Sequence, residues 1–359
     1  MFGDCILFLV KREELRDHGS MNILIIGGSV FLGRAFVHEA VERGHSVTVF
    51  NRGKSGPDMA GTKSIHGDRE NAADLEALAA AGPWDAVIDT SGFHPRTVGR
   101  SARALSGRAG TYLFVSSFHV YDPWPAGPVD ESSERLPCPP DAAVEDVPGN
   151  ALKAGCERAV EEYFDGEVCI LNPGLIVGPR ETPGRLLWWL ERMARGGEVL
   201  APGRAEQTIQ LIDARDIAEF GLDLLQTGAA GRYLVTGPKD TTTLGELLEE
   251  CARVTGAGAT TVWAPEDFLV EQGLGPWVEL PFWALEQPAM AGAWAASPAK
   301  AVAAGLRCRP LSQTVADTWE WLRERGPADA PYRQGDAVIG VDPDKEREVL
   351  RAWRAKASG

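Results

Sequence analysis

The strongest constraint on the fold is an apolar segment, residues 21–26, that runs directly into two consecutive glycines, Gly27 and Gly28. A continuous apolar stretch of this length, ended by a glycine turn, predicts a parallel strand buried on both faces. Residues 31–43 then follow a helical pattern, and residues 46–50 alternate like a second strand. The sequence therefore predicts the opening β-α-β unit of a dinucleotide-binding fold.

The alternation of strands and helices continues for about 150 residues, which favours an α/β protein with a doubly wound, Rossmann-type parallel sheet. Further strands are predicted at residues 86–90, 112–116 and 168–171, and further helices at residues 75–81 and 151–164. After Gly178 the pattern changes, and residues 208–212 and 233–236 are expected to form short strands that return to the sheet.

This pattern divides the chain into a nucleotide-binding domain and a smaller C-terminal lobe that would bind the substrate. The predicted parts are an N-terminal extension (1–20), an NAD(P)-binding domain (21–178, with return strands at about 208–240), a substrate-binding lobe (179–207 and 241–335) and a C-terminal helix (336–359, helical over 343–355). Within the lobe, a capped helix is expected over residues 241–255 and an irregular apolar region over 263–294.

Composition excludes several classes of partner. The chain carries 36 Lys and Arg against 51 Asp and Glu, a formal charge of −15 that repels nucleic acids and anionic membranes. The apolar run at residues 5–10 is too short to span a bilayer. The six cysteines form no C-x-x-C pair and the six histidines show no metal-binding spacing, so we expect no bound metal and a cytoplasmic location.

The glycine turn is the predicted site of the dinucleotide phosphates. A pyrophosphate reaches backbone N–H groups only where no Cβ intervenes, and the helix N-terminus then supplies positive potential. Val30 stands where the usual spacing has its middle glycine. The residues expected to bind the cofactor here are Gly27, Gly28, Ser29, Phe31, Leu32 and Gly33.

The end of the second strand indicates which dinucleotide binds. NAD sites commonly place Asp or Glu there to accept from the ribose 2′-hydroxyl, but this chain has Asn51 and Arg52, with Lys54 nearby. Arg52, with help from Lys54 or Arg34, could hold a 2′-phosphate. We therefore expect NADP(H) rather than NAD(H), the alternative being a solvated basic turn.

Several short motifs, in a characteristic order over residues 21–325, resemble the extended short-chain dehydrogenase/reductase superfamily in its NAD-dependent epimerase/dehydratase branch. They read GGSVFLGR (27–34), HGDRE (66–70), DTSG (89–92), VSSFHVY (115–121), LKAGCE (152–157), NPGLIVGP (172–179) and IDARD (212–216). The resemblance implies further cofactor contacts from Asp68, Arg69, Thr90, Ser91, Gly92, Ser116, Asn172, Pro173, Gly174 and Leu175. Some plant relatives of the subgroup bind RNA, which the charge of this chain disfavours.

The same resemblance implies a catalytic Ser, Tyr and Lys, of which the Tyr transfers the proton and the Lys lowers its pKa. Ser117 and Lys153 match the serine and the lysine. The tyrosine should stand four residues before Lys153, but that position is Gly149. Because glycine has no proton to give, ordinary carbonyl reduction and 4-keto epimerisation are in doubt.

Four interpretations of this departure remain open. Another side chain transfers the proton, with Tyr121, His119 and His94 as candidates beside Ser117 and Lys153. Alternatively the fold performs dehydration, elimination or cyclisation without net hydride transfer. The third interpretation is a non-catalytic NADP-binding regulator, and the fourth is a binding module without cofactor, which the intact motifs argue against.

The substrate is predicted to be a small organic molecule, of a sugar-like or secondary-metabolite kind, and the resemblance allows a homodimer. Arginines could pair with a carboxylate or phosphate and tryptophans could stack on a ring, although core or solvated roles are equally consistent. The proline-rich segment 122–150 is a candidate lid. The proposed substrate contacts are Phe93, Trp124, Gly149, Asn150, Arg180, Arg185, Trp188, Arg204 and Gln210.

Overall fold

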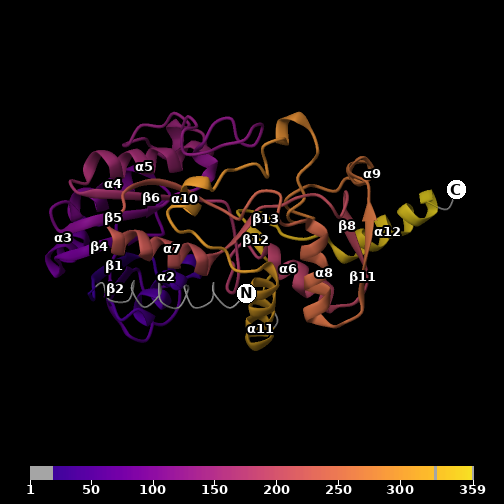
Figure 1. Ribbon diagram of the computed structural model, residues 1–359, viewed down its shortest axis with the longest axis horizontal. Coiled ribbons are helices and arrows are strands. Elements are labelled where there is room, and N and C mark those ends of the chain that lie inside the picture. The colour runs from indigo at the N-terminus through magenta and orange to yellow at the C-terminus, as the bar shows by residue number, and fades with distance from the viewer. Residues whose placement is uncertain (1–18, 327–329, 358–359) are drawn as a thin grey trace.

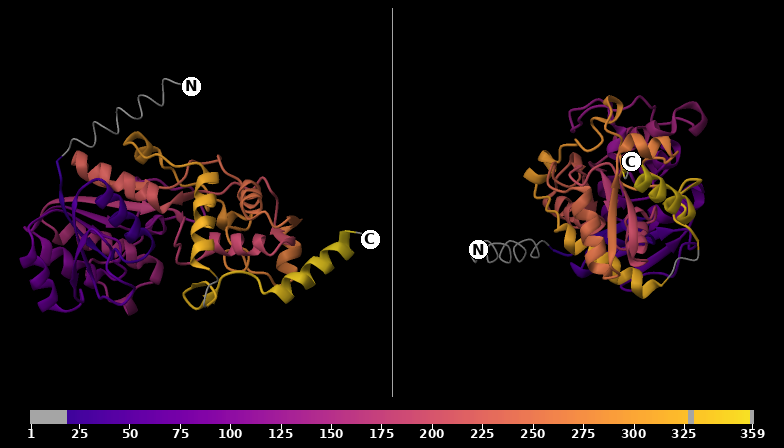
Figure 2. Two further views of the ribbon diagram at one scale, coloured as in Figure 1. Left: turned by 90° about the horizontal axis from the view of Figure 1, so that it is seen from below. Right: turned by 90° about the vertical axis from the view of Figure 1, so that its right-hand side faces the viewer.

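The computed structural model describes residues 19–326 and 330–357. Two parts lie side by side, a sheet-based part and a second part that ends in the helix α12 (Pro343–Ala357) (Figures 1 and 2). Of the predicted N-terminal extension, residues 1–18 lie outside the described residues.

The first part is built on a seven-stranded sheet in the order β10-β6-β5-β4-β1-β2-β3. All neighbouring strands are parallel, which confirms the predicted doubly wound α/β fold. The strands are β1 (Asn22–Ile26), β2 (Ser46–Asn51), β3 (Thr62–His66), β4 (Trp84–Asp89), β5 (Ala109–Val115), β6 (Glu167–Pro173) and β10 (Gly231–Val235).

Helices cover both faces of this sheet because both faces are apolar (Figure 1). On one face lie α2 (Phe31–Glu42), α7 (Ala214–Thr227) and α10 (Ala299–Ala303), and on the other α3 (Ala72–Ala81), α4 (Pro95–Leu105) and α5 (Leu152–Tyr163). Successive residues of β1 point to opposite faces. Ile23 and Ile25 therefore pack under α2 and α7, whereas Leu24 and Ile26 pack under the other group.

The second part has an apolar core of its own, in which Trp189 and Trp283 are fully buried. Its elements are α6 (Arg185–Ala194), β8 (Gly197–Pro202), α8 (Leu244–Thr255), β11 (Ala259–Ala264), α9 (Glu266–Glu271), η4 (Pro288–Met290), α11 (Leu311–Arg325), β12 (Arg333–Gln334), β13 (Ala337–Val338) and α12. The expected helix cap before α8 is a capping box between Thr243 and Glu246.

The prediction that residues 208–212 return to the central sheet is wrong. The strand formed there, β9 (Leu211–Asp213), pairs with β7 (Leu175–Val177) in a separate two-stranded sheet. Both edges of β6 are already occupied, by β5 on one side and by β10 on the other. Only the second predicted return strand, β10, therefore reaches the sheet.

The strand order reverses between β1 and β4, and this switch point positions the site. In open α/β sheets, ligands bind in the crevice beyond the carboxyl ends of the strands at such a point. The glycine turn follows β1, and Thr90 and Ser91 follow β4 on the other side of the crevice. Among the residues that the structure describes, no helix is long and apolar enough to cross a membrane.

The helix α2 lies so close to the turn after β1 that position 33 has no room for a side chain. A Cβ at Gly33 would lie 2.6 Å from the backbone nitrogen of Gly28 and 2.8 Å from the Thr90 hydroxyl. We predict that Gly33→Ala forces the helix away from the turn and lowers the free energy of unfolding by roughly 1–3 kcal/mol, measured by urea denaturation. Gly275→Ala is the control, because its nearest neighbour would lie 3.6 Å away. Equal stability of the two variants would contradict this account.

Candidate functional site

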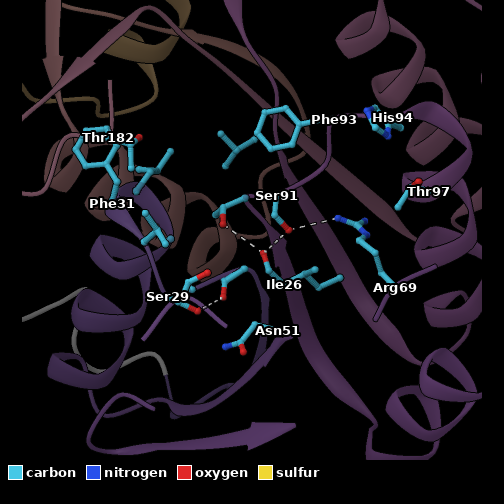
Figure 3. A pocket seen from close by; sticks show the side chains of 18 of the residues that line it. Ile26, Ser29, Phe31, Asn51, Arg69, Ser91, Phe93, His94, Thr97 and Thr182 are labelled. Atoms are coloured by element: carbon cyan, nitrogen blue, oxygen red, sulfur yellow. Dashed lines mark hydrogen bonds between the residues drawn. The ribbon is translucent and has the colours of Figure 1, made fainter. Parts of the chain in front are cut away.

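A cavity of about 820 Å³ opens at the carboxyl ends of β1, β2, β4 and β5. Figure 3 shows its walls, with Ser29 and Asn51 on one side, Phe93 and His94 on the other, and Ser91 between them. Most of the predicted site residues line it. They are Gly27, Gly28, Ser29, Phe31, Leu32, Gly33, Asn51, Arg52, Asp68, Arg69, Thr90, Ser91, Phe93, His94, Ser116, Ser117, His119, Gly149, Asn150 and Lys153.

The glycine turn has the shape that a dinucleotide requires. Gly27 and Gly28 adopt positive φ values of 110° and 73°, which L side chains rarely adopt. A Cβ on Gly27 would also lie 2.5 Å from the Thr90 hydroxyl. Because these positions carry no side chain, the turn leaves backbone groups open to the cavity at the start of α2, and the residues present fit a dinucleotide.

The far end of the cavity carries the groups expected to select the dinucleotide. Asn51 accepts a hydrogen bond from the Gly53 N–H at 2.6 Å, which fixes the turn after β2. Arg52 is exposed and lines the cavity, together with Ser55. Lys54 is exposed but is not part of the cavity wall. The structure thus places Arg52, rather than Lys54, beside the predicted adenosine end.

Arg69 lines the cavity, but its charge is already compensated. Its guanidinium pairs with the fully buried Asp89 at 2.6 Å and also contacts Ser101. Burial would raise the pKa of Asp89, yet the pairing with Arg69 outweighs it and holds that pKa below its usual range. Tyr112 donates a further hydrogen bond to Asp89. This arrangement anchors the end of β4, so a direct cofactor contact by the Arg69 charge has little support.

The predicted catalytic lysine and serine meet at the other end of the cavity. Lys153 Nζ donates to the Val115 carbonyl at 2.8 Å and lies 4.8 Å from the centroids of the Phe93 and Phe114 rings. Burial lowers the pKa of this lysine. The Ser117 hydroxyl accepts from the His119 N–H at 3.3 Å and begins the short helix η1 (Phe118–Val120).

No neighbouring residue lies close to the position that a side chain at Gly149 would occupy. Gly149 begins η3 (Gly149–Ala151) directly before α5, so it stands on the same stretch of chain as Lys153. A Cβ there would have no heavy atom within 4 Å. Gly149 is exposed and lines the same cavity as Ser117 and Lys153.

His119 is the titratable side chain best placed to act in this cavity. Its ring lines the cavity and stacks on Trp124, with centroids 4.3 Å apart and planes inclined by 19°. Desolvation within the cavity, and secondly the charge of Arg185, lower the pKa of His119 to about 4, although part of the side chain is exposed to solvent. The imidazole is therefore neutral at physiological pH. His94 is exposed on the rim, where it precedes α4.

Tyr121 does not reach the cavity, which argues against it as the proton donor. The ring is fully buried, and its hydroxyl donates to the Asn172 side chain at 3.0 Å. Asn172 in turn donates to the Ser117 carbonyl at 3.2 Å and to the buried Glu157 at 2.6 Å. Arg135 pairs with the same carboxylate at 3.0 Å. These four residues form a buried network behind Ser117.

The residues at the end of β6 and after it that are predicted to lie against the nicotinamide do not line the cavity. Asn172 and Pro173 are buried, a Cβ on Gly174 would meet Thr236 at 2.4 Å, and none of residues 172–175 lines the cavity. Ile176 and Thr182 line it instead. Gly92 is likewise buried behind the wall, against Phe114 and Val98.

Most predicted substrate contacts on the second part lie elsewhere. Arg180 lines a second, adjacent cavity, and Arg185 bonds Gln334 on β12. Trp188 belongs to the apolar core, Arg204 pairs with Glu286 on the surface, and Gln210 is buried against the Gly237 and Ala296 carbonyls. The Trp124 ring stacks on the ring of His119. Residue type alone does not distinguish an arginine, tryptophan or glutamine that is buried or ion-paired from one that binds a substrate.

Sequence reasoning missed Glu157, Ser55, Thr97, Ile176 and Thr182. Glu157 had a local signal, since it stands four residues after Lys153 and so shares its helix face. Ser55 and Thr182 lie in loops, Thr97 lies in the first turn of α4 and Ile176 lies on β7, so their positions depend on segments distant in the sequence. Among the described residues, no three His, Cys, Asp or Glu side chains gather as a metal site.

The network behind Ser117 makes a stability prediction. Removing Glu157 leaves Arg135 and Asn172 without their buried acceptor, so Glu157→Ala should lower the free energy of unfolding by about 3 kcal/mol in urea denaturation. Glu161→Ala removes the exposed partner of the same arginine and should cost under about 1 kcal/mol. If both substitutions had the same small effect, Glu157 would not anchor the network.

Comparisons with known proteins agree with this architecture. The chain is 28% identical to the chloroplast stem-loop binding protein of 41 kDa b from Arabidopsis thaliana over 250 residues, which are 65% of this chain and 63% of that protein. It thus spans less than two thirds of the length of this relative.

Solved structures share the fold. UDP-glucose 4-epimerase from Thermotoga maritima, solved with UDP-glucose, matches with a TM-score of 0.61 at 18% identity, covering 85% of this chain and 99% of that one. The enzyme WbmG of Bordetella bronchiseptica, solved with NAD and UDP, matches with a TM-score of 0.63 at 18% identity, covering 86% and 96%. The family model of the NAD dependent epimerase/dehydratase family matches residues 23–237. The chain therefore belongs to the NAD dependent epimerase/dehydratase family.

Proposed function

We propose that this protein is an NADP(H)-preferring member of its family in which His119 performs the proton transfer of the missing tyrosine. Its substrate is a small, sugar-like or secondary-metabolite alcohol or ketone. The observation that carries the proposal is that Ser117, His119 and Lys153 line the same cavity as the glycine turn, and that the cavity wall has no side chain at Gly149.

The cavity residues fit a nicotinamide dinucleotide laid along the carboxyl ends of the strands. The glycine turn would hold the pyrophosphate, and Asn51 and Arg52 the adenosine end. Lys153 would hold the nicotinamide ribose. When bound, the nicotinamide supplies reversible hydride acceptance, which no side chain of the protein can supply.

The side chains at the other end can bind and deprotonate an alcohol. The Ser117 hydroxyl can hydrogen-bond the substrate oxygen, and the neutral His119 imidazole can accept its proton. Stacking on Trp124 holds the imidazole ring in one orientation, and the Lys153 charge favours a developing oxyanion. In the reverse direction, the protonated His119 returns the proton to the substrate oxygen.

A second candidate function is favoured by the same absence of a side chain at Gly149. With no phenol at position 149, the cavity accepts a bulkier substrate, and a retained dinucleotide could assist elimination, dehydration or cyclisation without net redox change. Nucleic acid remains an unsuitable ligand for a chain with a formal charge of −15, although the Arabidopsis relative is named for stem-loop binding.

The redox state of the cofactor separates these functions. We expect the purified protein to bind NADP(H) and to change the near-ultraviolet absorbance of the reduced nicotinamide during turnover of a panel of nucleotide sugars and small alcohols and ketones. Product formation with oxidised cofactor retained and no absorbance change would favour the non-redox function. Failure to bind any nicotinamide dinucleotide would contradict both.

Arg52 tests the cofactor preference. Because a guanidinium–phosphate pair contributes a charge-assisted, bidentate interaction, Arg52→Gln should weaken NADP⁺ binding about tenfold or more in calorimetric titration. The affinity for NAD⁺, which lacks the 2′-phosphate, should stay unchanged and serves as the internal control. A wild-type protein that binds the two dinucleotides equally well would contradict the preference.

His119 tests the catalytic assignment. His119→Gln should reduce kcat by about 10²- to 10⁴-fold, the usual contribution of a positioned acid or base. His94→Gln, at the rim, should change it little, and Lys153→Met should abolish turnover. Since the pKa of His119 is lowered to about 4, wild-type activity should not fall between pH 8 and pH 6 by protonation of this ring, and should fall only toward about pH 4. Full activity of His119→Gln would remove His119 from the mechanism.

A further inference from the structure

A second cavity of about 720 Å³ adjoins the first, on the outer side of the glycine turn. The two cavities share Ser29, Val30, Phe31, Ser55 and Thr182 as walls. In Figure 3, Phe31 and Thr182 stand together at the edge of the first cavity, where this shared wall lies. The second cavity lies between the two parts of the protein, since α11 of the second part closes it through Trp321 and Arg325.

The side chains that line this cavity carry mainly positive charge. Four arginines line it, Arg34 from α2, Arg180 after β7, Arg325 at the end of α11 and Arg333 on β12. Glu181 is the carboxylate in this wall, but its two oxygens accept the backbone N–H groups of Arg185 and Leu186 at 2.9 and 3.0 Å. Burial also raises the pKa of Glu181 to about 7, which weakens it as a counter-charge.

Arg34 is half-buried and Arg180 is exposed where they line this cavity. Within the described residues, neither has a carboxylate partner within ion-pair distance. Five arginines elsewhere are paired with carboxylates, namely Arg43 with Asp223, Arg135 with Glu157, Arg192 with Glu346, Arg215 with Asp317 and Arg309 with Asp216. The half-buried Arg158, Arg185 and Arg232 instead donate to carbonyl or amide oxygens. Arg325 itself bonds Glu191 and Tyr332.

Arg34 and Arg180 also act on each other as like charges. Desolvation, and secondly the charge of Arg34, lower the pKa of the Arg180 guanidinium. The Arg180 side chain lies over Trp321, with its guanidinium carbon 5.5 Å from the ring centroid, and its backbone has a φ of 71°. Residues with a side chain rarely adopt such a φ. Two like charges in a concave site are stabilised most simply by a shared anion.

We propose that the second cavity binds a phosphate group between Arg34 of the first part and Arg180 of the second, and that this contact links the two parts across the glycine turn. Arginine forks suit phosphate because they donate two parallel hydrogen bonds to its oxygens. The phosphate comes either from the 2′-position of a bound dinucleotide, in which case the inference rests on the proposed function, or from a separate phosphorylated ligand.

Calorimetric titration of the full chain with NADP⁺, NAD⁺ and inorganic pyrophosphate tests the inference. The variants are Arg34→Gln and Arg180→Gln, and the matched control is Arg253→Gln, which removes the same charge from an exposed pair on α8 and lines neither cavity. Arg180→Lys keeps the charge but loses the fork and should bind with intermediate affinity. Circular dichroism checks that each variant is folded.

If the 2′-phosphate is the ligand, both Arg→Gln variants weaken NADP⁺ about tenfold or more while NAD⁺ and the control are unchanged. If a separate phosphorylated ligand binds, pyrophosphate binds the wild type even when NAD⁺ is saturating, and both variants lose this binding. The inference is overturned if neither affinity changes beyond the change in Arg253→Gln. A wild type that binds pyrophosphate but no dinucleotide would refute the proposed function and leave this site standing.

Discussion

The structure depends on one close approach, where the turn after β1 meets the end of β4. Gly27 has room for no side chain against Thr90, and Gly33 has none against Gly28. This packing brings the N-terminus of α2 to the switch point of the sheet and leaves backbone groups facing the cavity. The cofactor end of the site is therefore largely a consequence of backbone geometry, and the side chains of Asn51 and Arg52 line the same cavity.

The catalytic end is built differently, on a buried polar network. Burial raises the pKa of Glu157 and favours its neutral form, and Arg135 and Asn172 oppose that effect only in part. The network joins the end of β6, the start of α5 and the backbone of Ser117. It fixes the backbone of Ser117, and none of Tyr121, Arg135, Glu157 and Asn172 lines the cavity. Gly149, where the family resemblance predicts a tyrosine, takes no part in this network.

The helices and strands of the first part could be predicted because the sequence patterns that specify them are local. The apolar run of β1, the glycine turn and the helical pattern of α2 each lie within a few residues of one another. The site was harder to predict where residues that are far apart in the sequence determine its structure. The motif around Asn172 resembles a cofactor wall, but the hydrogen bonds to Glu157 and Ser117, 15 and 55 residues away, turn its side chain inward. Likewise, Trp188 could not be assigned to the core before the packing of α6 against α8 was known.

The most direct measurement is a crystal structure of the protein with NADP⁺ bound. The account predicts the pyrophosphate at the glycine turn, the adenosine end at Asn51 and Arg52, and the nicotinamide ring beside Lys153, facing Ser117, His119 and Gly149. A dinucleotide bound elsewhere, or bound with its nicotinamide end away from Lys153, would contradict the account. So would a loop that moves on binding and places another acid or base in the space left by Gly149.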